Sequence, residues 1–258
     1  MEYGLIGEHL GHSYSPEIHA QLADYRYELR EIEPDKLDAF MRAKNFKAIN
    51  VTILYKQRVI PYLDEISPQA QRIGAVNTIV NREGRLYGTN TDYAGMKALI
   101  EKMGLDLNGR KVLILGTGGT SRTAYAVAQD MGASQICKVS RSGNDGALTY
   151  EQAIADHSDA RIIINTTPVG MYPHVDAKPV DIQHFPGLEG VVDAIYNPLR
   201  SELVKDAQAA GIPAQGGLYM LAAQGVYAYG EFLSREVSTA DIDRVYANVL
   251  QMKSEAAE

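Results

Sequence analysis

Four short stretches of this sequence place reactive or hydrogen-bonding side chains where apolar runs end. They are HSYSP with Ser13 and Ser15, NVTILYK with Thr52 and Lys56, AVNT with Asn77, and TNTDYAG with Asn90 and Asp92. In an open α/β sheet, ligands gather beyond the carboxyl ends of the strands. Hydroxyls, amides, a lysine and a carboxylate collected there predict a pocket for a small, hydroxylated, anionic molecule.

Each of these side chains also has a purely structural interpretation. Ser15 could N-cap a helix that begins at Pro16, and Asp92 could N-cap the next helix. Asn77 could be a turn residue, and Lys56 could simply open a solvated loop. The pocket is therefore predicted from the four stretches jointly.

The first hundred residues alternate strand and helix patterns. Strands are expected at Tyr3 to Gly7, Tyr25 to Ile32 and Phe46 to Ile53, with helices opening at Ser15-Pro16 and Pro34-Asp35. Strands that alternate with helices predict an α/β layer structure with a mostly parallel sheet.

A second unit follows a helix expected at about 93–103. The apolar run KVLIL at 111–115 leads into GTGGTS and then into a helical pattern, and further strand runs follow at SQICKVS, RIIINTT and GVVDAIY. This pattern predicts a doubly wound nucleotide-binding domain. Helical patterns at 216–233 and 239–252 could cap this unit or return to the first.

The glycine loop between KVLIL and the following helix predicts dinucleotide binding. Gly116 permits a tight turn, Gly118 and Gly119 leave a bare backbone, and the helix N-terminus supplies N–H groups and positive potential. Ser121 occupies the third position of the G-x-G-x-x-G pattern, where a small side chain still permits close packing.

The end of the next strand indicates which dinucleotide is bound. Ser140, Arg141 and Ser142 stand where an NAD site usually carries an acid, and Asp145 lies farther along. A carboxylate at this place would repel a 2′-phosphate, whereas the arginine attracts it. The expected cofactor is therefore NADP.

Composition excludes several other classes of function. The chain has 258 residues and a formal net charge of -7 with no block of basic residues, which argues against nucleic-acid binding. No window is long and apolar enough for a membrane span. The single cysteine, Cys137, rules out an internal disulfide and fits a reducing, cytoplasmic compartment. The histidines form no metal-binding pattern, so no metal is expected.

The ordered motifs resemble one known family. HSYSP, NVTILYK, AVNT, NTD, GTGGTSR, NTTPVGM, DAIYNP and GLYMLAAQ occur in the order seen in shikimate dehydrogenases, from about residue 12 to residue 224. The resemblance implies NADP-dependent, reversible reduction of 3-dehydroshikimate to shikimate in aromatic amino-acid biosynthesis. It also implies a substrate domain at 1–92, completed by helices at 218–258, and a Rossmann-type NADP domain at 93–217, in a monomer or homodimer.

The resemblance also assigns roles to individual residues. It implies that Lys56 is the catalytic acid and base with Asp92 as its neighbour, because a cationic donor can stabilise and protonate the alkoxide that a reduced ketone leaves. The carboxylate of the substrate would be held by Ser13 and Ser15 with Tyr196 nearby. The ring hydroxyls would face Thr52, Asn77, Asp92 and Gln224. The remaining cofactor contacts would be Thr166, Met171, Gly217 and Met220.

The chain departs from the usual family pattern at three places. Leu54 stands where proline is usual, Ser140 where asparagine is usual, and Ser201 near the place of a threonine. Two other functions stay open at this point: a catabolic quinate/shikimate dehydrogenase, and a homologue that senses a ligand without turning it over.

Overall fold

The computed structural model describes residues 1–11, 13–144 and 146–255, and its chain divides into two compact units. Unit 1 comprises Met1–Gly95 together with the chain from Ala222 onward, and unit 2 comprises Met96–Leu221. The later helices of the chain thus return to the first unit, which is one of the two alternatives that the sequence left open.

Unit 1 is built on a six-stranded mixed sheet. Its strands are β1 (Tyr3–Gly7), β2 (Tyr27–Glu31), β3 (Ala48–Val51), β4 (Glu65–Ile66), β5 (Thr78–Arg82) and β6 (Arg85–Thr89), in the order β2-β1-β3-β5-β6-β4. β5 runs antiparallel to both β3 and β6, while the other described pairs are parallel. The prediction of an α/β fold is confirmed, but the sheet is mixed rather than mostly parallel.

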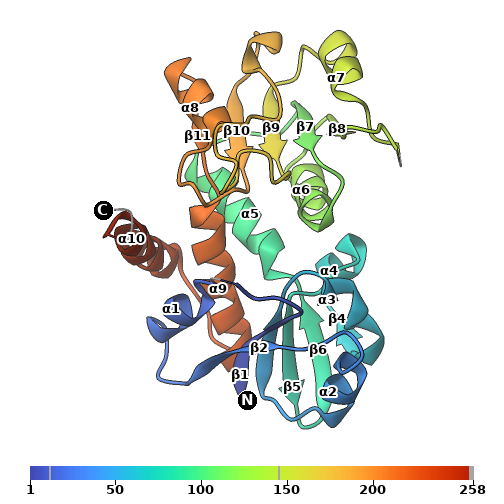
Figure 1. The fold of residues 1–258 in the computed structure, drawn as a ribbon, viewed down its shortest axis with the longest axis vertical. Helices are drawn as coiled ribbons and strands as arrows, with labels where there is room; N and C mark the ends of the chain where they lie inside the picture. The colour runs from blue at the N-terminus through green and yellow to red at the C-terminus, as the bar shows by residue number, and fades with distance from the viewer. Residues whose placement is uncertain (12, 145, 256–258) are drawn as a thin grey trace. The chain divides into compact units, whose positions relative to one another are not determined.

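Helices cover both faces of this sheet (Figure 1). The helices of unit 1 are α1 (Ser15–Ala20), α2 (Leu37–Ala43), α3 (Tyr55–Arg58), η1 (Ile60–Tyr62), α4 (Pro68–Ile73), the start of α5 (Thr91–Lys102), most of α9 (Leu218–Leu233), and α10 (Thr239–Glu255), which packs on α1. One face packs Ile6, Ile49 and Ile79 into an aliphatic core, and the other packs Ala48 and Val80 against Phe232 of α9. The alternation of β3 side chains between these faces fixes its register.

Unit 2 is a five-stranded parallel sheet. Its strands are β7 (Lys111–Leu115), β8 (Gln135–Val139), β9 (Ile162–Asn165), β10 (Gly190–Asp193) and β11 (Ala214–Gln215), in the order β11-β10-β9-β7-β8. The connecting helices are α6 (Gly119–Asp130), α7 (Tyr150–Asp156), η2 (Ile182–His184) and α8 (Glu202–Ala209). β7, β9 and β10 are almost wholly buried, as parallel strands covered on both faces must be. The predicted doubly wound architecture is confirmed.

The strand expected at Phe46 to Ile53 is shorter than predicted. β3 ends at Val51, and Ile53 and Leu54 are 71% and 62% exposed. An apolar side chain beyond the strand end satisfies the same sequence pattern as a strand residue, so the pattern alone extends the strand too far.

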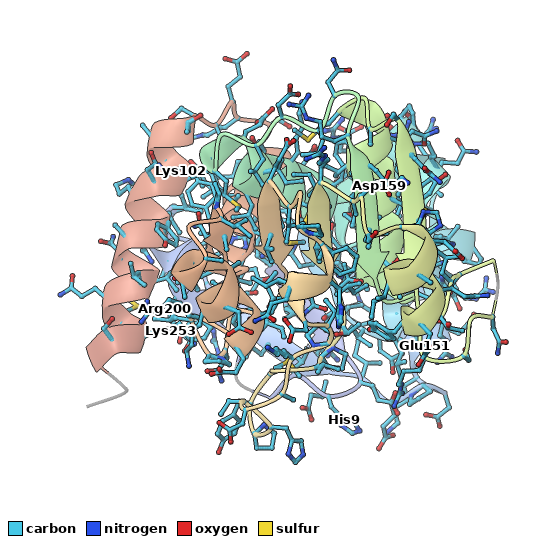
Figure 2. The ribbon with its side chains drawn as sticks, turned by 90° about the horizontal axis from the view of Figure 1, so that it is seen from above. His9, Lys102, Glu151, Asp159, Arg200 and Lys253 are labelled. Atoms are coloured by element: carbon cyan, nitrogen blue, oxygen red, sulfur yellow. The ribbon has the colours of Figure 1, made fainter. Side chains whose placement is uncertain are left out.

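Charged side chains such as those of Glu151 and Asp159 are exposed at the surface (Figure 2). None of the helices in the described part of the chain is both long and apolar enough to cross a membrane.

Candidate active site

The centre of the predicted pocket is an ion pair between Lys56 and Asp92. The Lys56 Nζ lies 2.6 Å from the Asp92 Oδ2. The two side chains are 27% and 19% exposed, so the pair is sheltered from bulk water but still reachable by a ligand. A charge-assisted contact of this length fixes the direction of the ammonium group.

Backbone hydrogen bonds on both sides of Lys56 hold it in place. It lies in the four-residue helix α3, where the Tyr55 N–H donates to the Thr52 carbonyl (3.0 Å) and the Lys56 carbonyl accepts from the Val76 N–H (2.8 Å). The Tyr55 ring is fully buried, and its hydroxyl donates to the Ile32 carbonyl. Lys56 therefore extends from an anchored turn and does not open a solvated loop.

The Asn77 side chain positions the start of α5, which carries Asp92. Asn77 is 3% exposed, its Oδ1 accepts from the Thr91 N–H (2.7 Å), and its Nδ2 donates to the Thr91 Oγ1 (3.1 Å). The Asn90 Oδ1 accepts from the Tyr93 N–H (3.3 Å), which is the bond an N-cap residue makes. The N-cap residue of this helix is thus Asn90 and not Asp92. Asn77 is a buried residue whose side chain holds the helix start, and it is not a turn residue.

Ser13 and Ser15 converge at the start of α1. The Ser13 Oγ donates to the Ser15 Oγ (3.2 Å) and accepts from the Ser15 N–H (3.2 Å). The helix begins at Ser15, and Tyr14 at its N-cap makes no side-chain capping bond. The two half-buried hydroxyls therefore form a pair at a helix start. His12, which opens the HSYSP stretch, lies outside the described residues, as does Asp145.

The other predicted substrate residues are divided between the two units. Thr52 follows β3 in unit 1, where its N–H donates to the Ile6 carbonyl (3.0 Å), and half-buried Gln224 lies on the part of α9 that belongs to unit 1. Tyr196 lies in unit 2 after β10. Unit 1 alone thus supplies Ser13, Ser15, Thr52, Lys56, Asn77, Asp92 and Gln224.

The glycine loop of unit 2 combines a tight turn with an open backbone. Gly116 has a φ of +110°, and a Cβ added to it would lie 2.7 Å from the Thr166 Oγ1, so only glycine fits. At Gly118 and Gly119 an added Cβ would meet no described atom within 4 Å, so the backbone before α6 faces open space. Ser121 is fully buried, and its Oγ has no hydrogen-bond partner among the described residues. An open backbone at a helix start suits an anionic cofactor, whereas the buried Ser121 hydroxyl is not accessible from solvent.

The arginine expected to select NADP lies just beyond β8. Ser140 stabilises the turn that follows β8. Its Oγ accepts from the Gly143 N–H (3.1 Å), and its N–H donates to the Leu148 carbonyl (2.9 Å). Arg141 and Ser142 are exposed at the carboxyl end of the strand next to β7. This position places a cation beside the glycine loop strand, as a 2′-phosphate site needs.

The remaining predicted cofactor residues differ in their surroundings. The Thr166 Oγ1 donates to the Leu115 carbonyl (2.6 Å) and so ties β9 to the glycine loop strand. Met171 is 44% exposed, whereas Met220 is 9% exposed. A Cβ on Gly217 would lie 2.3 Å from the Ala194 carbonyl oxygen, so close packing explains this glycine without any cofactor.

Sequence reasoning missed a buried carboxylate in unit 2. Asp193 is completely buried at the end of β10 and accepts from the Asn165 Nδ2 (3.0 Å), the Ile195 N–H (3.0 Å) and the Ser201 Oγ (2.5 Å). Burial raises the pKa of Asp193 to about 6, although these hydrogen bonds act to lower it. The sequence could have indicated this residue, because an acid ends the otherwise apolar run GVVD.

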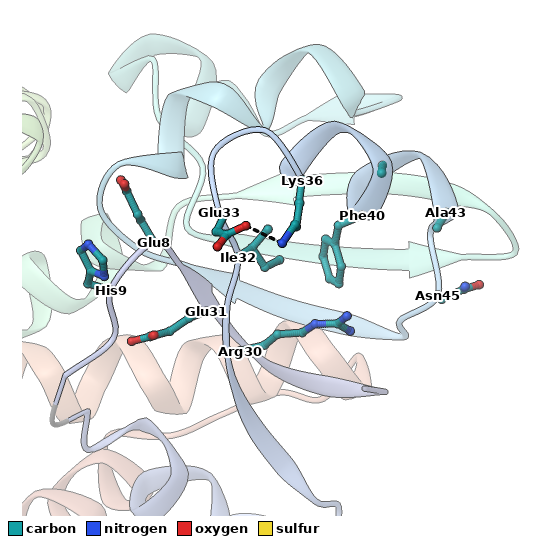
Figure 3. A pocket seen from close by; sticks show the side chains of 11 residues that line it. Glu8, His9, Arg30, Glu31, Ile32, Glu33, Lys36, Phe40, Ala43 and Asn45 are labelled. Carbon is teal, nitrogen blue, oxygen red and sulfur yellow. Dashed lines mark ion pairs between the residues drawn. The ribbon is translucent and has the colours of Figure 1, made fainter.

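A hollow of about 650 Å³ in unit 1 is separate from this site (Figure 3). It lies between β2 and α2, where Glu33 pairs with Lys36 and the Arg30 guanidinium lies 5.1 Å from the Phe40 ring centroid. The predicted site residues are not among those that line it. No cluster of ligands that could hold a metal ion occurs among the described residues.

Unit 2 is a parallel sheet with a glycine loop, and unit 1 carries a lysine–carboxylate pair. This combination is typical of a dinucleotide-dependent oxidoreductase of the α/β class. A family profile described as the shikimate dehydrogenase substrate binding domain matches residues 5–79. The chain is 38% identical to the shikimate dehydrogenase (NADP(+)) of Geobacillus kaustophilus, covering 96% of this chain and 97% of that one, and 36% identical to that of Clostridium perfringens (strain ATCC 13124), covering 88% and 90%. The chain belongs to the shikimate dehydrogenase (NADP(+)) family.

Solved structures agree with this assignment. Shikimate dehydrogenase 1 from Peptoclostridium difficile superposes with a TM-score of 0.85 at 35% identity, covering 96% of this chain and 98% of that one. Shikimate 5-dehydrogenase from Thermus thermophilus, solved in complex with NADP(H) and shikimate, gives a TM-score of 0.84 at 29% identity, covering 96% and 99%. The predicted fold class, family and NADP-dependent enzyme class are confirmed.

Proposed function

We propose that this chain reduces 3-dehydroshikimate to shikimate reversibly with NADPH, as a step in the biosynthesis of aromatic amino acids. The main chemical support for this proposal is the Lys56–Asp92 ion pair, in which the Lys56 Nζ lies 2.6 Å from the Asp92 Oδ2. Family membership and the Thermus thermophilus complex with NADP(H) and shikimate support the choice of substrate and cofactor.

Lys56 acts as the acid in reduction and as the base in oxidation. Bound NADPH supplies the hydride. The ketone oxygen becomes an alkoxide as it is reduced, and the Lys56 ammonium stabilises this charge and donates a proton to it. In the reverse direction the neutral amine takes the proton from the hydroxyl. Asp92 orients Lys56 through their ion pair and accepts a hydrogen bond from a ring hydroxyl.

The other unit 1 residues bind the substrate. Ser13 and Ser15 donate to its carboxylate, and Tyr196 of unit 2 serves the same group. Thr52, Asn77 and Gln224 hold the ring hydroxyls. Two hydroxyl donors without an arginine are a mild arrangement for a carboxylate, so a modest affinity is expected.

The unit 2 residues fit NADP. The open backbone at Gly118 and Gly119 suits the pyrophosphate, and Arg141 suits the 2′-phosphate. Buried Ser121 contributes as a small side chain that permits close packing behind the loop. Ser140 and Ser142 flank that arginine. Met171, Gly217 and Met220 lie near the nicotinamide, and Thr166 is a further cofactor contact. The substrate domain is accordingly proposed as 1–92 with 218–258, and the NADP domain as 93–217.

We place the enzyme in the cytoplasm as a monomer or homodimer. A single cysteine, Cys137, fits a reducing compartment. Gel filtration with light scattering distinguishes the two assemblies.

The test is the loss of reduced-nicotinamide absorbance when the purified protein meets 3-dehydroshikimate, with NADPH and NADH in parallel. Rapid oxidation of NADPH with little oxidation of NADH is the expected result. Comparable turnover of quinate and shikimate in the reverse assay would instead indicate a catabolic enzyme. Shikimate binding without any turnover would indicate a ligand sensor, and Leu54→Pro would then be the first variant to assay.

A further inference from the structure

A buried amide, Asn165, ends β9 and anchors the chain segment that follows this strand, residues 166–172. Asn165 is completely buried, and its Oδ1 accepts from the Thr167 N–H (3.0 Å) and from the Thr167 hydroxyl (2.8 Å). The Thr167 Oγ1 in turn accepts from the Val169 N–H (3.3 Å). The Asn165 side chain thus fixes the start of this segment.

The nitrogen of the Asn165 amide is held by the carboxyl group of Asp193. The Asn165 Nδ2 donates to the Asp193 Oδ1 (3.0 Å), which also accepts from the Ile195 N–H (3.0 Å). Backbone N–H groups only donate, so the atoms that face the N–H groups of Thr167 and Ile195 must be acceptors. An amide suits the place between them, because it accepts at one end and donates at the other. These hydrogen bonds therefore fix the orientation of Asn165, with its oxygen toward Thr167.

The start of segment 166–172 contacts the glycine loop strand. The Thr166 Oγ1 donates to the Leu115 carbonyl (2.6 Å). A Cβ added to Gly116 would lie 2.7 Å from the Thr166 Oγ1 and 3.3 Å from the Thr167 Cγ2. A shift of either threonine would therefore reach the first glycine of the loop.

The far end of segment 166–172 is attached to the chain that follows β10. The Tyr172 N–H donates to the Asn197 carbonyl (3.0 Å). Met171, the proposed nicotinamide contact, lies between the two attachments and is 44% exposed, so a ligand can reach it. The place of Met171 thus depends on how both ends of the segment are held.

We propose that Asn165 is a positioning residue for NADP, which holds segment 166–172 so that Met171 meets the nicotinamide half of the cofactor. This proposal rests on the proposed function, in which Met171 lies near the nicotinamide. Because Asn165 is completely buried, it acts through the segment and not by contact with the cofactor.

The test uses Thr167→Val, which removes the hydroxyl bond to Asn165 and keeps the size of the side chain. Calorimetric titration measures the Kd for NADP and for adenosine 2′,5′-bisphosphate, a fragment with the 2′-phosphate but no nicotinamide. Loss of one hydrogen bond should raise the Kd for NADP about three- to tenfold. The Kd for the fragment should be unchanged, because the fragment is held at Arg141. Asn165→Ala should raise the Kd for NADP further.

Val112→Ala is the matched control for a general loss of stability in unit 2. Val112 is fully buried near the amino end of β7, so its truncation weakens the core without removing a hydrogen bond of Asn165. The midpoint of thermal unfolding should fall, and both Kd values should be unchanged. The Kd for shikimate should be the same in all three variants, because the proposed substrate residues lie mainly in unit 1.

Two outcomes would overturn the proposal. One is an unchanged Kd for NADP in Thr167→Val, which decides the matter alone if Asn165→Ala does not fold. The other is an equal loss of affinity for NADP and for the fragment, which would indicate general damage to unit 2. A wild type that binds NADP but does not turn over shikimate would instead contradict the proposed function, so the two failures are distinguishable.

Discussion

At the scale of single residues, the chemistry-bearing side chains were recognisable from sequence, but some of the residues that hold them in place were not. Lys56, Asp92 and Ser15 end apolar runs, which marks them in the sequence alone. Tyr55, beside Lys56, follows an ordinary apolar pattern, and only the fold brings its hydroxyl to the Ile32 carbonyl. Long-range hydrogen bonds between buried groups leave no trace in local spacing.

Replacing Lys56 with alanine should remove most of the turnover. The kcat should fall about 10²- to 10⁴-fold, with a smaller change in the KM for shikimate, because the lysine is needed mainly in the transition state. Steady-state assays with NADP and shikimate measure both constants. Lys97→Ala, which removes a surface pair with Glu101, is the control. A raised KM with intact kcat would make Lys56 a binding residue only.

His19 should make the protein less stable as the pH falls. Burial lowers the pKa of His19 to about 3, whereas an unfolded chain binds this proton near pH 6.5. Between these values the unfolded state takes up a proton that the folded state refuses, so up to about 1.4 kcal/mol of stability is lost per pH unit.

Urea unfolding of His19→Phe and wild type at several pH values measures this effect. The variant should be less stable at neutral pH, and the difference should shrink on acidification. His9→Gln, which alters an exposed histidine, should follow the wild-type pH profile. A constant difference between His19→Phe and wild type would contradict the expected titration.

At the scale of helices and strands, the centre of unit 2 was predicted well because β7, β9 and β10 are nearly continuous apolar runs. The hairpin of β5 and β6 was not predicted, although Glu83 and Gly84 at its turn have φ values of 53° and 84°. Two consecutive residues at positive φ are typical of a tight hairpin turn, but Asn or Asp usually precedes the glycine. The short β11 depends on pairing with β10 and carries no pattern of its own.

Asp193, which is hydrogen-bonded to Asn165 of β9 and to Ser201 before α8, should tolerate loss of its charge. Burial raises the pKa of Asp193 to about 6, above the value of 3.8 expected when unfolded, so ionisation of this carboxyl costs stability as the pH rises between these values. Asp193→Asn keeps an acceptor for Asn165 and Ile195 and can donate to Ser201.

Asp193→Asn should therefore match wild type near pH 4 and be about 2 kcal/mol more stable at pH 7. Chemical denaturation at the two pH values gives the free energies of unfolding. Asp181→Asn, at a partly exposed cap of η2, should show no such pH-dependent gain. A variant that is less stable than wild type at pH 7 would mean that the charged hydrogen bonds outweigh burial.

At the scale of the whole molecule, the two units should respond separately to the two ligands. The proposed substrate residues lie mainly in unit 1 and the glycine loop in unit 2. Hydrogen exchange followed by mass spectrometry should show that shikimate slows exchange around residues 13–20 and 77–93, and that NADP slows it around 116–122 and 140–143. Protection of unit 2 alone by shikimate would contradict the assignment of the substrate domain.

The division of unit 1 between two distant parts of the chain has a consequence for how the protein is made. The ribosome releases β1 to β6 first, but Phe232, which covers Ala48 and Val80, is synthesised only after the whole of unit 2. A nascent chain must therefore keep one apolar face of its first sheet uncovered while more than a hundred further residues are added. Such a face is the kind of surface that aggregates or recruits chaperones during translation.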